Sequence, residues 1–128
     1  MKIIKTKAPK SYSSQESVDF DEGEIRDIEA TGADVVAYWY VHEDYEGSGY
    51  ILLHFPSGEL LLESASHCSC YGPTEHLMSV PAVSWASSMQ DLVGRFSPDM
   101  FEEARPLVEA MQEHLKTGEV LAKAFQAN

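Results

Sequence analysis

An α+β fold is the class that this sequence predicts, because strand-like segments come first and helix-like segments follow. Residues 35–63 contain three short runs rich in β-branched, aromatic and aliphatic residues, joined by tight links. Residues 87–126 instead repeat apolar residues at helical spacing. Separate runs of strands and helices are typical of α+β proteins. We therefore expect an antiparallel β-meander of about three strands (residues 35–63) packed by C-terminal helices (residues 87–126).

The first 17 residues are basic and rich in serine, which predicts a mobile N-terminal segment ahead of a single α+β domain at residues 18–128. Ile3 and Ile4 leave open an edge strand within this segment. Residues 22–30 then predict a short helix, and Gly32 follows as its terminator.

Three segments of the central region predict β-strands. Residues 35–42 are β-branched or aromatic almost throughout, while residues 50–55 and 59–63 are short apolar runs. The Pro-Ser-Gly sequence at residues 56–58 favours a tight turn, because proline presets φ and glycine accepts a positive φ. The last two strands should therefore form a hairpin.

The C-terminal region carries several helix signals. Ser87, with a glutamine three residues later, is typical of a capping box. Ser97 followed by Pro98 predicts a second helix start, with serine as the N-cap and proline at the first helical position. Pro106 falls inside the apolar stripe that follows, and we expect it to kink or divide that helix. Thr117-Gly118 should end that helix. A short terminal helix is then expected from the apolar residues Val120, Leu121, Ala124 and Phe125.

The charge of the chain is strongly negative and unevenly distributed. The net charge is −12, but residues 1–10 carry four lysines and no acid, a net of +4. Residues 16–46 carry eleven acids against one arginine, a net of −10. Such a field repels phosphates, so direct nucleic-acid binding over a broad surface is disfavoured, whereas a basic surface of another protein would be attracted. A solvated face that only aids solubility is the alternative reading of these acids.

Both cysteines of the chain lie in residues 66–72, which read Ser-His-Cys-Ser-Cys-Tyr-Gly. Cys68 and Cys70 could supply two zinc ligands, with His67, His76 or His54 completing the site. Zinc is thus the one cofactor that this segment allows, although we expect no cofactor. One residue between the cysteines is shorter than the usual spacing of structural zinc sites.

Two other interpretations of this segment remain. A thiolate activated by a neighbouring histidine would make a small thiol enzyme, although the sequence has no phosphate loop, paired-histidine motif or nucleophile elbow. We therefore assign no catalytic residue. In the simplest interpretation, which we favour, both cysteines pack as small apolar residues where the chain turns out of the sheet.

The acidic, glycine-bearing link at residues 45–49, the hairpin turn after it and the motif at residues 66–72 resemble a group of small phage and prophage proteins. In that group a hairpin precedes a Gly-Ser-His-Cys-Ser-Cys-Tyr-Gly motif, and this sequence has Ala65 where the group has glycine. The resemblance covers residues 38–77. It implies a viral or mobile-element origin and the cytoplasm of a bacterial host, and it implies no particular reaction.

Together, charge and resemblance predict an acidic phage-type accessory protein that binds a host or viral protein with a basic surface. A strong form of this hypothesis is nucleic-acid mimicry, in which carboxylates occupy the cationic groove of a host nucleic-acid-binding or defence protein and inhibit it. Of the aromatic rings of Tyr38, Trp39 and Tyr40, at least one should lie near the surface. The expected contact surface combines such rings with neighbouring acids. These acids are Asp19, Asp21, Glu22, Glu24, Asp27, Glu29, Glu43, Asp44 and Glu46.

No apolar run approaches the length of about 18 residues that a membrane-spanning helix needs. The N-terminus also lacks the apolar core of a secretory signal. Two cysteines one residue apart do not make a disulfide framework, because a bridge there would close a strained ring. We therefore expect a cytoplasmic protein with free thiols and no membrane contact.

Overall fold

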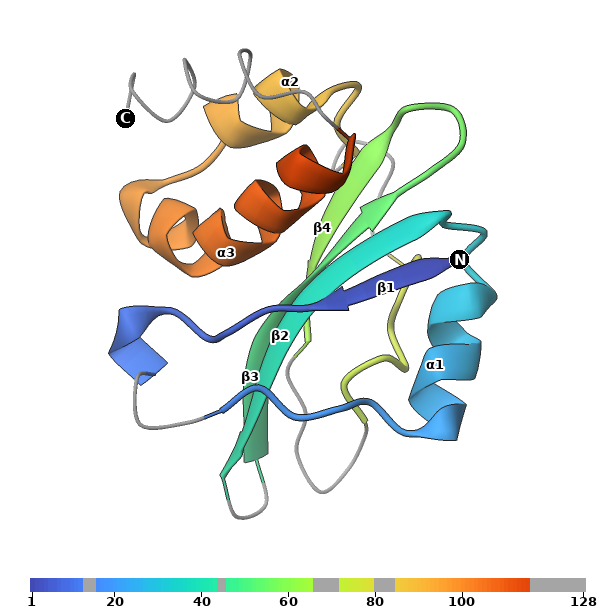
Figure 1. Ribbon diagram of the computed structural model, residues 1–128, viewed down its shortest axis with the longest axis vertical. Helices are drawn as coiled ribbons and strands as arrows, with labels where there is room; N and C mark the ends of the chain where they lie inside the picture. Colours follow the sequence, from blue (N-terminus) through green and yellow to red (C-terminus); the bar gives the residue numbers. More distant parts are fainter. Residues whose placement is uncertain (13–15, 44–45, 66–71, 80–84, 116–128) are drawn as a thin grey trace.

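The computed structural model describes residues 1–12, 16–43, 46–65, 72–79 and 85–115. The described elements form one mixed four-stranded sheet with helices against it, so the α+β class is confirmed (Figure 1). In chain order the elements are β1 (Lys2–Lys5), the 3-10 turn η1 (Lys10–Tyr12), α1 (Glu22–Glu29), β2 (Val35–Glu43), β3 (Glu46–His54), β4 (Leu60–Ser64), α2 (Met89–Gly94) and α3 (Pro98–Leu115).

The sheet has the order β1-β2-β3-β4, and its last three strands form the predicted antiparallel meander. The first strand was not part of that prediction. β1 pairs with β2 in parallel, with Ile3 opposite Val36, so the edge strand left open at Ile3 and Ile4 is present and the sheet is mixed. Lysines flank this short strand at Lys2 and Lys5, which masks its apolar pattern in the sequence.

The hairpin between β3 and β4 is closed by the turn that the sequence indicates. Gly58 has φ +93°, and its N–H donates to the Phe55 carbonyl at 2.8 Å. The Phe55 N–H in turn donates to the Glu59 carbonyl at 3.0 Å. A positive φ is readily adopted by glycine and strained for residues with a Cβ, which explains the residue at this position.

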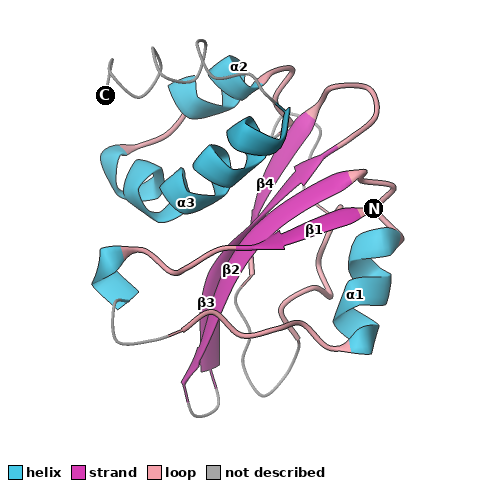
Figure 2. Ribbon diagram, viewed as in Figure 1, coloured by secondary structure: helices cyan, strands magenta, loops and turns pink. Residues whose placement is uncertain are grey.

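Alternate residues of the strands enter two separate apolar layers, one on each face of the sheet. Trp39 belongs to the layer under α2 and α3, together with Leu107, Val108 and Met111 of α3. Tyr38 belongs to the layer on the other face, where Ile28 of α1 is completely buried. Figure 2 shows α2 and α3 on one side of the sheet and α1 on the other. Because both faces are covered, the strands carry apolar residues on both sides.

The aromatic rings of β2 are all inside the molecule. Tyr38, Trp39 and Tyr40 are 3%, 0% and 4% exposed, so the expectation that one ring lies near the surface was wrong. The reason is that α1 and its lead-in cover the second face: Phe20 stacks on Tyr38 with ring centroids 4.1 Å apart. On the opposite face the Trp39 indole N–H donates to the Glu103 carbonyl of α3 at 2.7 Å.

The helix starts follow the predicted chemistry with one correction. Ser88, not Ser87, caps α2, because its hydroxyl accepts the Asp91 N–H at 3.1 Å while Ser87 lies one residue outside. Ser97 caps α3 by accepting the Met100 N–H at 3.2 Å. Pro106 does not divide α3, which runs from Pro98 to Leu115.

The short terminal helix expected after Gly118 lies outside the described residues. None of the helices within the described ranges combines the length and apolar character that crossing a bilayer requires.

Candidate functional site

Six of the nine acids expected at an interface lie on α1 or directly before it. Five of them, Asp19, Asp21, Glu22, Asp27 and Glu29, have exposed side chains, and Glu24 is half-buried. The helix is fixed against the sheet by Ile28, which is completely buried. We call these six residues together with Arg26 the α1 acidic surface.

Two of these acids shape the helix itself. The Asp21 side chain accepts the Glu24 N–H, and the Glu24 side chain accepts the Asp21 N–H, both at 2.8 Å. This capping box satisfies two donors that the first turn of a helix leaves without partners. Negative charge at a helix N-terminus also interacts favourably with the helix dipole. Asp21 and Glu24 therefore have a structural role that does not require a ligand.

Two further acids connect the helix region to neighbouring elements. Asp27 accepts a hydrogen bond from the hydroxyl of Thr74 at 2.7 Å, and Thr74 is buried. Asp19 lies 2.8 Å from the Lys5 ammonium, and this hydrogen bond raises the pKa of Lys5. The Lys5–Asp19 pair joins the basic N-terminal strand to the acidic segment, so part of the charge asymmetry is neutralised inside the molecule.

Among the described contacts of this surface, the carboxylates of Glu22 and Glu29 take part in no hydrogen bond. They lie four residues before and three residues after Arg26, so the three side chains share one helix face. The Arg26 guanidinium also donates to the Glu22 backbone carbonyl at 3.4 Å. The exposed face of α1 is therefore acidic, with Arg26 as the one basic side chain on this helix.

The other three predicted acids belong to the far end of the β2–β3 hairpin. Glu43 pairs with Glu46 through the backbone, and Asp44 and the side chains of Glu43 and Glu46 lie outside what the structure describes. In Figure 1 the end of this hairpin is separated from α1. The buried rings of β2 are not available either. The candidate surface is therefore smaller than the sequence suggested, and it is confined to α1 and its lead-in.

The proposed zinc ligands are mostly beyond the described ranges. His67, Cys68 and Cys70 lie outside them, and His76 is an exposed residue of the turn that follows. Among the residues that are described, no group of three or more histidines, cysteines and acids is arranged to hold a metal ion. Zinc binding at this segment stays a prediction.

One buried acid was not singled out by the sequence. Glu63 of β4 is 7% exposed, and its carboxylate accepts the Met78 N–H at 3.1 Å. Burial raises the pKa of Glu63, because an ionised carboxylate loses its hydration there. Met78 has φ 70°, a conformation uncommon for residues other than glycine. A glutamate at a strand end is usually solvated, so the sequence offered no signal for this contact.

The chain matches no family model, no curated protein and no solved structure. The resemblance to phage and prophage proteins therefore stays a prediction.

Proposed function

We propose that the protein acts by binding a basic surface of another protein through the α1 acidic surface. The observation that carries this proposal is the density of charge on α1 and its lead-in: residues 16–29 hold seven acids against one arginine. Carboxylates at this density complement lysine and arginine side chains of a partner and speed encounter with it.

The rigidity of α1 supports a binding role. Its first turn is held by the Asp21–Glu24 capping box, its middle is tied to Thr74 through Asp27, and Ile28 anchors its inner face in the core. A surface that is ordered before binding loses less conformational freedom in the complex. A flexible acidic tail of equal charge would lose more conformational freedom on binding. The ordered helix therefore favours a specific contact with a partner over a role in solubility alone.

The partner class that we propose is a host protein whose basic groove normally holds nucleic-acid phosphates. The net charge of −12 is consistent with binding in such a groove. By occupying the groove, the chain would inhibit the host protein. The bacterial setting follows only from the resemblance to phage proteins. The Lys5–Asp19 pair limits mimicry to α1, because the basic strand β1 lies beside the lead-in.

The test is a pull-down from bacterial lysate with three forms of the chain. The wild type is compared with Glu22→Gln/Glu29→Gln, which removes two exposed charges while leaving the capping box and Asp27 intact. The matched control is Glu59→Gln/Asp99→Asn, which removes two exposed charges elsewhere. Captured proteins are identified by mass spectrometry at low and raised salt, with and without competing double-stranded DNA.

The proposal predicts proteins that are captured by the wild type and the control but not by the α1 variant. Capture should weaken as salt rises and be displaced by DNA. Equal capture by all three forms, or capture that ignores both salt and DNA, would contradict the proposal.

A further inference from the structure

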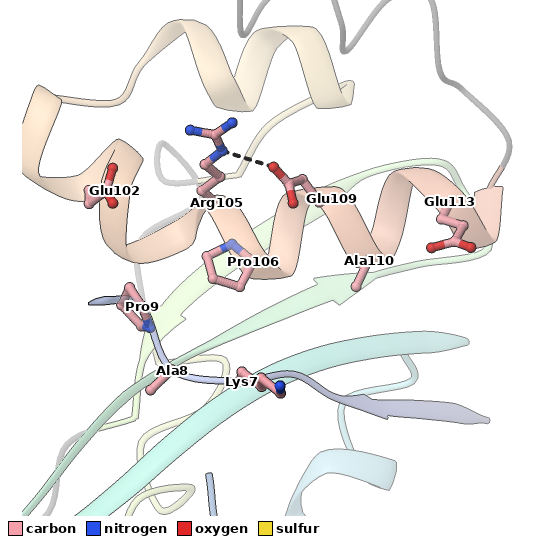
Figure 3. Close-up of a pocket in the computed structure, with 9 residues that line it drawn as sticks. All are labelled: Lys7, Ala8, Pro9, Glu102, Arg105, Pro106, Glu109, Ala110 and Glu113. Carbon is pink, nitrogen blue, oxygen red and sulfur yellow. Dashed lines mark hydrogen bonds and ion pairs between the residues drawn. The ribbon is translucent and has the colours of Figure 1, made fainter. Parts of the chain in front are cut away.

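A groove lies on the opposite side of the sheet from α1, between α3 and the N-terminal segment that follows β1. It has a volume of about 380 Å³, within the range of about 300–1,000 Å³ that ligand sites occupy. Figure 3 shows α3 along one side of the groove and residues 7–9 along the other.

The middle of the groove is apolar and its ends are acidic. Pro106 and Ala110 face the N-terminal segment, which contributes Ala8 and Pro9 (Figure 3). Glu102 and Glu113 then mark the two ends of the lining on α3, and both carboxylates are exposed. Positions 102 and 113 are eleven steps apart along α3, which at about 1.5 Å per helical residue places these ends about 16 Å apart.

The other charged residues of the lining do not change the acidic character of the groove ends. The Arg105 guanidinium binds the Glu109 carboxylate at 2.8 Å, so these opposite charges offset each other. Figure 3 shows this pair directed away from the N-terminal segment. Lys7 is the remaining cation of the lining and lies on the opposite wall. Glu102 and Glu113 against Lys7 leave the groove with a net negative charge.

The Glu102 end has a second feature that attracts a hydrogen-bond donor. Pro106 has no N–H, so the donor that would bind the Glu102 carbonyl in a regular helix is missing. The next carbonyl along α3, that of Glu103, accepts the Trp39 indole N–H from the sheet. A ligand that places N–H groups at the Glu102 end could bind both the carboxylate and the backbone oxygen of this residue.

We infer that this groove binds an extended peptide segment of a partner protein, with two basic side chains six residues apart and small apolar residues between them. An extended chain of either the β or the polyproline type returns to the same face after six residues, and at about 3.1–3.3 Å per residue these span about 19–20 Å. Two long basic side chains inclined toward each other from these positions reach carboxylates about 16 Å apart. Small residues and proline fit the shallow floor of Ala8, Pro9, Pro106 and Ala110. This contact is independent of the α1 acidic surface, because the two lie against opposite faces of the sheet.

The test uses the full chain, labelled with ¹⁵N, and a capped synthetic peptide of sequence Arg-Ala-Pro-Ala-Pro-Ala-Arg. Binding is followed by amide chemical shifts, with Ala8, Arg105 and Ala110 as reporters of the groove. A second peptide carries both arginines together at its N-terminus, and a third replaces them with glutamates. Circular dichroism confirms that each protein variant is folded.

The inference predicts shifts confined to the groove and saturable with the first peptide. Glu102→Gln/Glu113→Gln should weaken binding by about tenfold or more, while Glu22→Gln/Glu29→Gln, which removes the same charge from α1, changes it by less than about twofold. Ala110→Leu should abolish binding by filling the floor. Shifts spread over the whole acidic chain, equal affinity for the peptide with adjacent arginines, or equal loss in the α1 variant would overturn the inference.

Discussion

The hydroxyl of Thr74 donates a hydrogen bond to the Asp27 carboxylate at 2.7 Å, which joins the exposed helix α1 to a loop 47 residues later in the chain. Thr74 is 2% exposed, whereas Asp27 lies on the surface. One acid of the α1 acidic surface is therefore committed to holding the helix in place. The acids of this surface thus fall into two groups: those that hold α1 in position and those whose carboxylates are available to bind a partner.

The Thr74–Asp27 contact should contribute to stability. Thr74→Val removes the hydroxyl at nearly constant volume, and we expect it to lower the free energy of unfolding by about 1–2 kcal/mol. A double-mutant cycle with Asp27→Ala, measured by urea unfolding, should give a coupling energy of about 1 kcal/mol. Strict additivity of the two substitutions would show that the hydrogen bond contributes nothing.

Glu63 should make stability depend on pH. Because burial raises the pKa of Glu63 above 4.5, its contribution to stability is present below the unfolded-state pKa and is lost as the pH rises through the folded-state pKa. Glu63→Gln keeps an acceptor for the Met78 N–H and removes the ionisable group. We expect this variant to be more stable than the wild type at about pH 7, with the difference shrinking toward about pH 4.

Urea unfolding at a series of pH values checks this, with Glu59→Gln on the exposed turn of the same hairpin as the control for charge removal. A Glu63→Gln variant that is less stable than the wild type at neutral pH would mean that the ionised carboxylate is favoured in the fold.

Gly49 should tolerate no side chain. A Cβ at this position would clash with the Trp39 carbonyl oxygen and lie 2.9 Å from the Tyr40 Cα on the paired strand β2. Gly49→Ala should lower the free energy of unfolding by about 3 kcal/mol or more, since backbone atoms cannot move aside cheaply. Gly94→Ala is the matched control, because nothing lies within 4 Å of its Cβ and alanine favours the helix. Thermal unfolding of both variants compares them, and equal midpoints would contradict this account of the β2–β3 pair.

The Trp39 indole should couple the sheet to α3. Trp39→Phe keeps an aromatic ring in the core but removes the N–H that binds the Glu103 carbonyl. We expect a loss of about 1–3 kcal/mol in the free energy of unfolding, because that buried contact spans two elements. Trp85→Phe, at a half-buried ring beside Phe55, is the control for loss of an indole. A smaller loss of stability for Trp39→Phe than for Trp85→Phe would contradict a stabilising hydrogen bond from the Trp39 indole to the Glu103 carbonyl.

Local sequence signals predicted the elements that have strong local chemistry. The β-branched and aromatic run of β2 and the Pro-Ser-Gly turn after β3 are found where they were expected. β1 could not be predicted with the same strength, because four residues carry little periodicity and their partner, β2, begins some thirty residues later. Ser88 rather than Ser87 is the N-cap of α2, and just before it Ala86 pairs with Leu60 of β4 through the backbone, a long-range contact that the local sequence does not specify.

The candidate site was predictable as a region but not in its detail. The acids of residues 16–29 were visible in the sequence, yet their division into capping, tethering and exposed groups depends on contacts such as Asp27 with Thr74. The groove beside α3 had only one local signal, Pro106, which was expected to break the helix. Its second wall comes from residues 7–9, about a hundred positions away in the chain.

The exposed carboxylates of α1 are the groups that we propose to bind a basic partner protein. Isothermal titration of the captured partner with the wild type, Glu22→Gln/Glu29→Gln and Glu59→Gln/Asp99→Asn, each at low and raised salt, tests this proposal most directly. We expect about tenfold weaker binding and a shallower salt dependence for the α1 variant alone. Identical affinities for all three forms at both salt concentrations would contradict the proposal.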